Sequence, residues 1–302
     1  MSAAVPPPLG AVSHYTLLER LEPSGPGELY RARDTRLGRT VTVRVLPPGY
    51  PAGPIERQWL FDSAKAVIAL SHPNITLLYD AGEHEGRAFL VFEFLKGQTL
   101  RAEMAGRPMN VRRAVELAVQ MADGVAEAHG AGFFHGGLSP DSIVITARGH
   151  AKIPAFELAS RSGFEQDGRG VRLRDYDSPE EARGQAPDDR SDIYSVGAVL
   201  YEMLTTKRPP HKGAAAPSAS NPHVPPELDE VVLRAVAPNP ELRIQSAATL
   251  VAELRSLAAI LDVRGAAEDE HEHGDSARPG RGLLIAGGVL AALALIAYLL
   301  LA

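Results

Sequence analysis

The chain has 302 residues, of which 45% are hydrophobic and 23% charged, a composition typical of a globular protein with a buried core. Its net charge of −6 gives no basis for a nucleic-acid partner, and we expect none. The lack of cysteine excludes disulfide bonds and thiolate metal sites.

The first third of the chain is predicted to form strands and one helix. Residues 1–14 contain no basic or long apolar run, so we expect a disordered tail and not a secretory signal. Apolar and β-branched runs, broken by glycine and proline, predict strands, and the run at 55–70 predicts a helix. Residues 15–96 should therefore form a small β-rich lobe. The predicted strands are YTLLERL (15–21), GELYRAR (27–33), RTVTVRVL (39–46) and FLVFEFL (89–95).

Residues 97–261 are predicted to be mainly helical. Asn110 can cap a helix that runs to about His129 with one apolar stripe. Residues 192–205 are apolar on nearly all sides, which is typical of a central buried helix. Two more helices are predicted at 228–236 and 247–261.

The C-terminal part differs in composition from the rest. Residues 262–282 are acidic and rich in glycine, which predicts a flexible linker. Residues 283–302 carry no charge and are long enough, as a helix, to cross a bilayer. Arg278 and Arg281 precede this stretch and predict that its N-terminal side is cytoplasmic. We therefore expect a single-pass protein of the cell inner membrane with its folded part in the cytoplasm.

Several blocks of sequence resemble the bacterial Hanks-type serine/threonine protein kinases. They include RARDTRLGRTVTVRVL at 31–46, LSHPNITLLYD at 70–80, YDSPEEARG at 176–184 and RSDIYSVGAVLYEMLT at 190–205. The resemblance covers about residues 15–261. It implies an α+β fold with two lobes, a β-rich N-lobe (15–96) and a helical C-lobe (97–261), followed here by the linker and the transmembrane helix. In that family ATP binds between the lobes.

The positions that carry chemistry in this family are substituted. In FFHGGLSPDSIVI, Gly137 replaces the aspartate that accepts the substrate proton, and Ser142 replaces the asparagine that holds magnesium. Further family positions are filled by Ser139 for the catalytic-loop lysine, Arg44 for the ATP-binding lysine, Ser63 for its glutamate partner and Ala155 for the metal-binding aspartate. The resemblance, with these departures, implies a pseudokinase with no catalytic residue and no metal site.

Other family positions are kept. By the resemblance, five residues serve the fold: His135, Phe156, Glu180, Asp192 and Arg243. Glu180 and Arg243 are expected to form a buried ion pair, and Asp192 to hold the catalytic loop. Weak candidates for contact with a nucleotide are Gly27, Leu29, Thr42, Arg44, Glu93, Leu95 and Ile145, where 93–95 form the hinge between the lobes.

The sequence thus favours a membrane-tethered scaffold that has lost protein phosphorylation and regulates a cytoplasmic signalling partner, such as an active kinase. No cofactor is expected, with binding of ATP without magnesium left open. The alternative is an atypical serine/threonine kinase or a nucleotide sensor, in which Arg44 replaces the lysine and Glu157 a metal ligand. The oligomeric state does not follow from the sequence.

Overall fold

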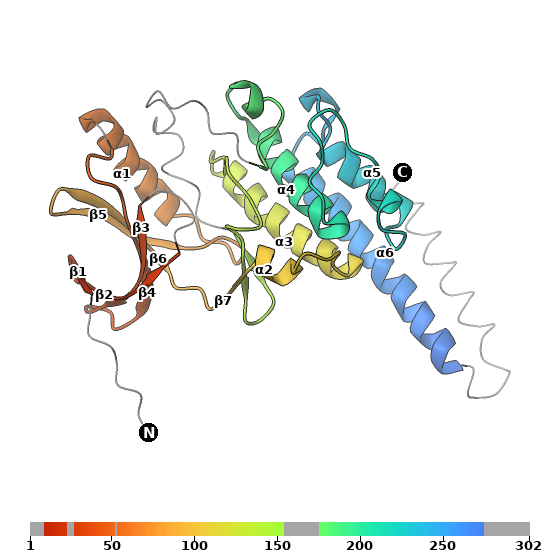
Figure 1. The fold of residues 1–302 in the computed structure, drawn as a ribbon, viewed down its shortest axis with the longest axis horizontal. Coiled ribbons are helices and arrows are strands. Elements are labelled where there is room, and N and C mark those ends of the chain that lie inside the picture. Colours follow the sequence, from red (N-terminus) through yellow and green to blue (C-terminus); the bar gives the residue numbers. More distant parts are fainter. Residues whose placement is uncertain (1–8, 23–26, 52, 154–174, 275–302) are drawn as a thin grey trace. The chain divides into compact units, whose positions relative to one another are not determined.

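The computed structural model describes residues 9–22, 27–51, 53–153 and 175–274. The chain divides into two compact units, Met1–Leu254 and Arg255–Ala302. The first unit holds a β-rich N-lobe and a helical C-lobe, so the two-lobed α+β prediction is confirmed (Figure 1).

The N-lobe is built on a six-stranded antiparallel sheet. Its strands follow the order β1-β2-β3-β4-β6-β5. Strands β2, β3, β4 and β6 lie where the alternation predicts them, whereas β1 and β5 were not predicted. Their bounds are β1 (Gly10–Val12), β2 (Tyr15–Leu21), β3 (Glu28–Asp34), β4 (Thr40–Val45), β5 (Leu78–His84) and β6 (Arg87–Glu93).

Strand β1 corrects the prediction that residues 1–14 form a disordered tail. Its residues pair with β2, with Gly10 opposite Leu17 and Val12 opposite Tyr15. The backbone reverses at Ser13, whose φ is 55°. Val12 is buried in the cluster that Tyr15 and Leu17 also join, so apolar burial explains why this short segment is ordered.

The central strand β4 divides the N-lobe core into two. Val41, Val43 and Val45 are buried on one face, with Tyr15, Leu17 and Phe89. The opposite face packs on helix α1 (Pro54–Ile68) through a second cluster that includes Leu60, Ala64 and Leu90. Because successive strand residues point to opposite faces, Thr42 and Arg44 lie on the α1 side of the sheet.

The C-lobe contains five α-helices and a small sheet among the described residues. Asn110 caps α3 as predicted, since its side chain accepts a hydrogen bond from the amide of Arg113 at 3.2 Å. The small sheet has the order β7-β8-β9. The elements are β7 (Gly97–Thr99), α2 (Leu100–Met104), α3 (Val111–Gly130), β8 (Val144–Thr146), β9 (Ala151–Lys152), α4 (Asp189–Thr205), α5 (Pro226–Ala235) and α6 (Ala247–Gly274).

Helix α4 is the centre of the C-lobe. Every residue from Ser191 to Thr205 is buried, as its apolar sequence predicts. Asp188 and Ser191 form a capping box at its start. Between α4 and α5 all residues are described, and they form only a 3-10 turn at Pro217–Ala219. The shortened connection after Pro210 therefore contains no α-helix.

Helix α6 extends beyond its predicted end. It continues past Leu261 to Gly274, within the stretch 262–282 that was predicted to be a flexible linker. Residues 262–274 contain no proline, so every residue of this segment can donate a helical hydrogen bond. Among the described residues, no helix is both long enough and apolar enough to span a bilayer. The predicted transmembrane stretch 283–302 lies outside them.

Candidate catalytic and nucleotide site

The loop after α3 carries the positions expected to perform catalysis, and Asp192 on α4 holds it. The carboxylate of Asp192 accepts hydrogen bonds from the amides of His135 at 2.7 Å and Gly136 at 2.8 Å. His129 on α3 contacts the same carboxylate at 2.8 Å. Gly136 has a φ of 61°, a conformation that glycine adopts without strain. The loop is therefore fixed through its backbone.

Gly137, Ser139 and Ser142 all belong to this loop. The hydroxyl of Ser142 donates to the carbonyl of Ser139 at 3.0 Å and accepts from the Ser139 amide at 3.2 Å. The serine hydroxyl that replaces the metal-binding asparagine is thus engaged within its own turn. Ala155, the other metal position, has an apolar side chain and lies outside the described residues, as does Phe156. The two metal positions, Ser142 and Ala155, therefore do not fit a magnesium ion.

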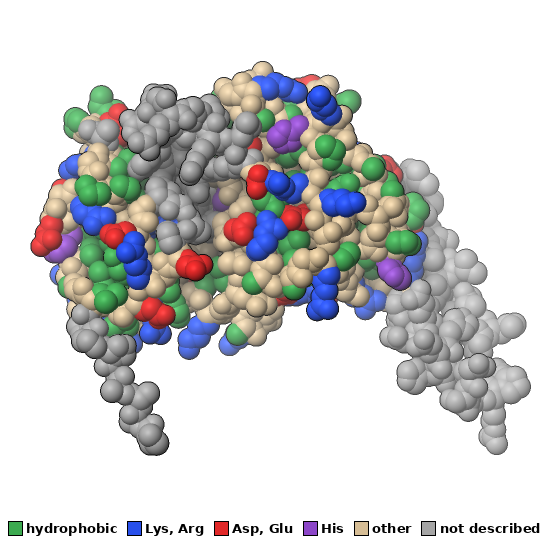
Figure 2. Space-filling model, in the orientation of Figure 1, with side chains coloured by type: hydrophobic (Ala, Val, Ile, Leu, Met, Phe, Trp, Pro, Cys, Tyr) green, Lys and Arg blue, Asp and Glu red, His purple; other side chains and the backbone are tan. Residues whose placement is uncertain are grey.

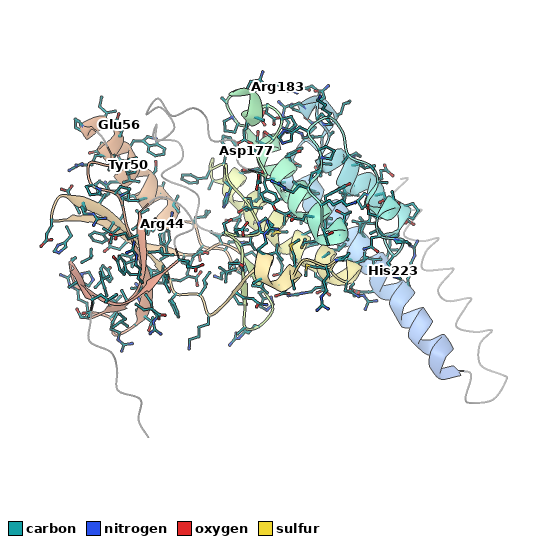
Figure 3. The ribbon with its side chains drawn as sticks, viewed as in Figure 1. Arg44, Tyr50, Glu56, Asp177, Arg183 and His223 are labelled. Carbon is teal, nitrogen blue, oxygen red and sulfur yellow. The ribbon has the colours of Figure 1, made fainter. Side chains whose placement is uncertain are left out.

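Three of the nucleotide candidates meet on the α1 face of the N-lobe sheet. Leu29 on β3 is directly opposite Arg44 on β4, and Thr42 is opposite Phe92 on β6. Directly opposed residues of antiparallel strands point to the same face. Leu29, Thr42 and Arg44 are all partly buried, so this face presents two apolar or weakly polar side chains and one cation. Figure 3 shows Arg44 among the strands of the N-lobe.

Gly27, which directly precedes β3, has a structural reason to be glycine. Its φ is 90°, and a Cβ atom added there would lie 2.3 Å from the carbonyl oxygen of Val45. The backbone of the glycine-loop segment therefore approaches β4 more closely than any other residue type allows. The loop residues 23–26 lie outside the described part of the chain.

Ser63 lies on α1, where the family has the glutamate that pairs with the lysine. Its neighbour Asp62 does not replace that glutamate. Its carboxylate accepts hydrogen bonds from Gln58 at 2.7 Å and Lys65 at 3.1 Å on its own helix, and its side chain is 55% exposed. The Gln58 and Lys65 hydrogen bonds lower the pKa of Asp62. Its charge is thus directed to solvent.

The hinge is anchored by a lysine that the sequence did not single out. Lys152 on β9 contacts the carboxylate of Glu93 at 2.5 Å and also donates to the carbonyl of Ile75 at 3.2 Å. Glu93 additionally accepts from the amide of Leu77 at 2.9 Å. The Glu93 side chain therefore joins the hinge to the C-lobe sheet and is not available to a nucleotide. Ile145 on β8 is buried, and Leu95 is partly buried between β6 and β7.

Glu180 and Arg243 form the ion pair that the resemblance implies. Both hydrogen bonds from the Arg243 guanidinium to the Glu180 carboxylate are short, with Nη1 to Oε1 at 2.5 Å and Nη2 to Oε2 at 2.6 Å. The side chains are 0% and 8% exposed for Arg243 and Glu180 respectively. Arg243 also donates to the carbonyl of Ala237 at 2.7 Å. This pair ties the segment after Ser178 to the chain before α6.

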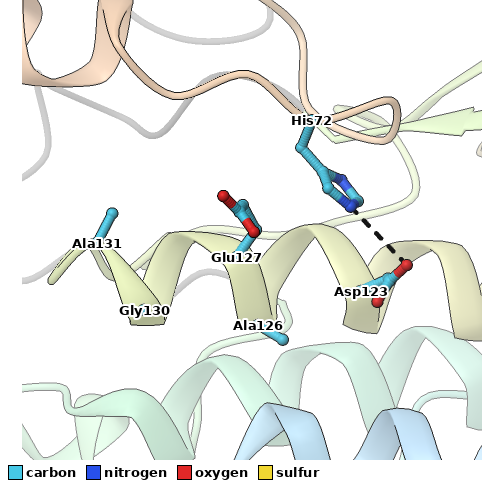
Figure 4. A pocket seen from close by; sticks show the side chains of 6 residues that line it. All are labelled: His72, Asp123, Ala126, Glu127, Gly130 and Ala131. Atoms are coloured by element: carbon cyan, nitrogen blue, oxygen red, sulfur yellow. Dashed lines mark ion pairs between the residues drawn. The ribbon is translucent and has the colours of Figure 1, made fainter.

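An open pocket of about 470 Å³ lies beside α3, away from these positions. Figure 4 shows His72 facing Asp123 across it, with His72 Nε2 and Asp123 Oδ2 3.8 Å apart. Glu127 on the next turn of α3 is exposed. Over the face shown in Figure 2, acidic and basic side chains lie next to one another on the C-lobe.

Comparison with known proteins identifies the fold. The protein kinase domain model matches residues 25–251. The chain belongs to the protein kinase family. The probable serine/threonine-protein kinase SCO3848 of Streptomyces coelicolor is 33% identical over 257 residues, which are 77% of this chain and 38% of that protein. The serine/threonine-protein kinase PknB of Mycobacterium tuberculosis is 36% identical over 264 residues, 80% of this chain and 42% of PknB.

Solved structures agree on the kinase fold. The crystal structure of the M. tuberculosis PknI kinase domain has a TM-score of 0.67 and 22% identity, and covers 82% of this chain and 97% of that domain. The chain spans about two fifths of the length of the curated relatives it matches.

These relatives contradict the prediction of a scaffold that has lost protein phosphorylation and is not an enzyme. The proteins related to this chain at 33–36% identity are named serine/threonine-protein kinases. The prediction inferred lost activity from six substituted family positions taken together, one of which, Ala155, lies outside the described residues. The relationship favours the alternative of an atypical kinase.

Proposed function

We propose that this chain is an atypical serine/threonine protein kinase that binds ATP against the α1 face of the N-lobe sheet. The observation that carries the proposal is the relationship to named kinases across 77–80% of the chain. The kept framework supports it, because Asp192 holds the catalytic loop and Glu180 is bound by Arg243.

Phosphoryl transfer depends mainly on positioning and on charge stabilisation, so a protein has little covalent chemistry to perform. In this proposal Arg44 supplies the positive charge for the phosphates. The guanidinium is always protonated but differs in geometry from a lysine ammonium. No step is derived through magnesium, because Ser142 is engaged by Ser139 and Ala155 offers no ligand atom. Gly137 removes the usual proton acceptor, which generally costs about 10²–10⁴ in rate, so we expect slow turnover.

The test is transfer of the γ-phosphate by the full chain, purified in mild detergent because residues 283–302 are uncharged. Transfer is measured with and without magnesium in the native chain, in Arg44→Ala and in Arg57→Ala. Arg57 is a matched control, since it pairs with Glu83 on the surface of the same lobe at 2.7 Å. Transfer that is lost in Arg44→Ala and kept in Arg57→Ala supports the proposal. Unchanged transfer in Arg44→Ala combined with Glu157→Ala would remove both substitute groups from consideration.

A nucleotide sensor is the second candidate. It is favoured by Ser142, whose hydroxyl is engaged within its own turn instead of facing a ligand. Calorimetric titration with ATP measures binding, and the transfer assay above then distinguishes the two candidates. Binding with transfer indicates the kinase, and binding without transfer indicates the sensor. Neither binding nor transfer would refute both.

The cellular setting is also proposed from the sequence. We place the folded part in the cytoplasm, tethered to the cell inner membrane by residues 283–302, where it acts on a signalling protein. Arg278 and Arg281 before that stretch support this orientation. Fractionation of cells that express the full chain, compared with a chain ending at Arg264, tests the tether.

A further inference from the structure

The hinge residue Glu93 is bound through both its backbone and its side chain. Its amide donates to the carbonyl of Leu77 at 2.9 Å, and its carboxylate oxygen Oε1 accepts from the amide of Leu77 at 2.9 Å. Lys152 Nζ contacts the same Oε1 at 2.5 Å and donates to the carbonyl of Ile75 at 3.2 Å. These four contacts form a ring, called here the hinge ring, that joins the end of β6, the chain before β5, and β9.

The chain before β5 is also fixed to the strand that carries Lys152. The amide and the hydroxyl of Thr76 both donate to the carbonyl of Ile153 at 2.9 Å. The amide of Ile153 donates to the carbonyl of Asn74 at 2.8 Å. The side chain of Asn74 donates to the carbonyl of Ala151 at 2.8 Å. The backbone on both sides of Lys152 is therefore held, which fixes the region that its ammonium group can reach.

The ion pair of Lys152 with Glu93 is sheltered from solvent. The two side chains are only 16% and 17% exposed. Charges at this depth are screened by salt much less than charges on the surface, and removal of one partner leaves the other charge poorly solvated. The pair of Lys65 with Asp62 on α1 is the opposite case, with side chains that are 74% and 55% exposed. Lys65 is therefore a matched control for Lys152.

The hinge ring lies at the end of the strand pair that carries the nucleotide candidates. Glu93 is directly opposite Val41 on β4, and the next pair is Phe92 with Thr42. Arg44 lies two pairs beyond Thr42. Because paired strands are joined by backbone hydrogen bonds, a shift of Glu93 displaces Thr42 first and Arg44 less.

We propose that Lys152 is a positioning residue for the nucleotide, which sets the affinity for ATP by holding the hinge end of β6 in place. Its ammonium group is directed to Glu93 and to the carbonyl of Ile75, so it acts through these groups and not on the phosphates. Loss of the hinge ring should weaken the binding of ATP and leave the rate of transfer from bound ATP nearly unchanged, because Arg44 is further from the ring. The nucleotide part of this inference rests on the proposed function, whereas the hinge ring itself does not.

The first experiment tests the hinge ring without any nucleotide. Amide hydrogen exchange of the full chain in mild detergent is compared for the native protein, Lys152→Met and Lys65→Met. We expect the amides of Leu77 and Glu93 to exchange about tenfold faster in Lys152→Met, equivalent to about 1.4 kcal/mol, and at the native rate in Lys65→Met. Lys152→Arg keeps the charge and should restore most of the protection. Native exchange rates in Lys152→Met would overturn the proposal.

The second experiment measures the affinity for ATP by calorimetric titration. We expect the Kd of Lys152→Met to rise about tenfold, and those of Lys152→Arg and Lys65→Met to stay within about twofold of the native value. Glu93→Gln removes the charge of the same pair and keeps an acceptor for the Leu77 amide, and it replaces Lys152→Met if that variant does not fold. An unchanged Kd in a folded Lys152→Met protein would contradict the proposal.

A double variant shows whether Lys152 acts through Glu93. Lys152→Met combined with Glu93→Gln should bind ATP no more weakly than Lys152→Met alone, because both changes break the same pair. In the transfer assay, the KM for ATP should rise in Lys152→Met while kcat changes less than about twofold. Additive losses of affinity, or a fall in kcat as large as the rise in KM, would indicate a general disturbance and contradict a positioning role.

The two experiments separate the two possible failures. If the native chain binds no ATP, the proposed function fails together with the nucleotide part of this inference, and hydrogen exchange still decides whether Lys152 holds the hinge. If the native chain binds ATP and transfers phosphate but Lys152→Met has the native affinity, the proposed function stands and this inference fails.

Discussion

Arg243 and Glu180 are joined by two parallel hydrogen bonds at 2.5 and 2.6 Å, although they lie 63 residues apart in the chain. Both side chains are almost completely removed from solvent. The guanidinium also stands over the ring of Tyr194 on α4, 5.0 Å from its centroid. The pair therefore joins the segment near Glu180, the central helix and the chain before α6.

Removal of one member of this pair should strongly destabilise the C-lobe. Arg243→Ala leaves the Glu180 carboxylate buried and uncompensated, a change that typically costs about 3–5 kcal/mol. Chemical denaturation should show this loss for Arg243→Ala. In the exposed pair of Arg57 with Glu83, whose side chains are 42% and 38% exposed, Arg57→Ala should cost about 1 kcal/mol or less. Similar losses for both variants would contradict the structural role of Arg243.

The same pair predicts how stability depends on pH. Burial alone would raise the pKa of Glu180, but the hydrogen bonds from Arg243 outweigh it and lower the pKa from 4.5 to about 2. A carboxyl with a lowered pKa in the folded state stabilises the protein above its unfolded pKa, and this contribution is lost as the pH falls through the folded pKa.

The free energy of unfolding of the native chain should therefore fall between pH 4.5 and about 2. Glu180→Gln removes this titration, so its difference from the native chain should be greatest at neutral pH and should shrink as the pH is lowered in that window. Urea denaturation at a series of pH values measures the difference. A difference that stays constant across the window would show that Glu180 does not titrate with a lowered pKa.

The sequence predicts those elements whose burial pattern repeats regularly. The alternation of apolar and polar residues predicts β4, and the largely apolar run at 192–205 predicts α4. Strand β5 has no such pattern, because Asp80, Gly82 and Glu83 make it read as a loop. It is a strand because it pairs with β6 through a tight turn at Glu85 and Gly86, which both have positive φ. Whether such a segment forms a strand depends on its pairing with a neighbouring strand, and the pattern of its own residues contains no information about that pairing.

The sequence predicts some residues of the candidate site and misses others, for a similar reason. Family motifs mark Asp192 and Glu180 because they occur in recognisable blocks of sequence. Lys152 carries no such mark, since its partner Glu93 is 59 residues away in the chain. The wrong prediction of lost activity came from six substituted family positions taken together. The relationship to named serine/threonine-protein kinases, which covers 77–80% of the chain, contradicts it.

Asp192 offers a test of how the catalytic loop is held. Asp192→Ala removes the acceptor for the amides of His135 and Gly136. A donor left unsatisfied in a buried place costs about 1–3 kcal/mol, so the two together should destabilise the protein measurably. Faster hydrogen exchange at these two amides is the specific readout. Asp62→Ala, at an exposed carboxylate, is the control and should leave their exchange unchanged. Continued protection of both amides in Asp192→Ala would contradict the role of Asp192.

Gly27 and Gly86 form a matched pair for the glycine loop. Both have positive φ, 90° and 75°, but a Cβ atom at Gly27 meets the Val45 carbonyl at 2.3 Å, whereas one at Gly86 meets nothing within 4 Å. Gly86→Ala should show only backbone strain, of about 1 kcal/mol. Gly27→Ala adds a clash with the backbone of β4, so it should cost about 1–3 kcal/mol more and weaken ATP binding by displacing the start of β3. Thermal unfolding and calorimetric titration measure the two effects, and equal losses of stability in both variants would show that β3 and β4 are not in close contact at Gly27.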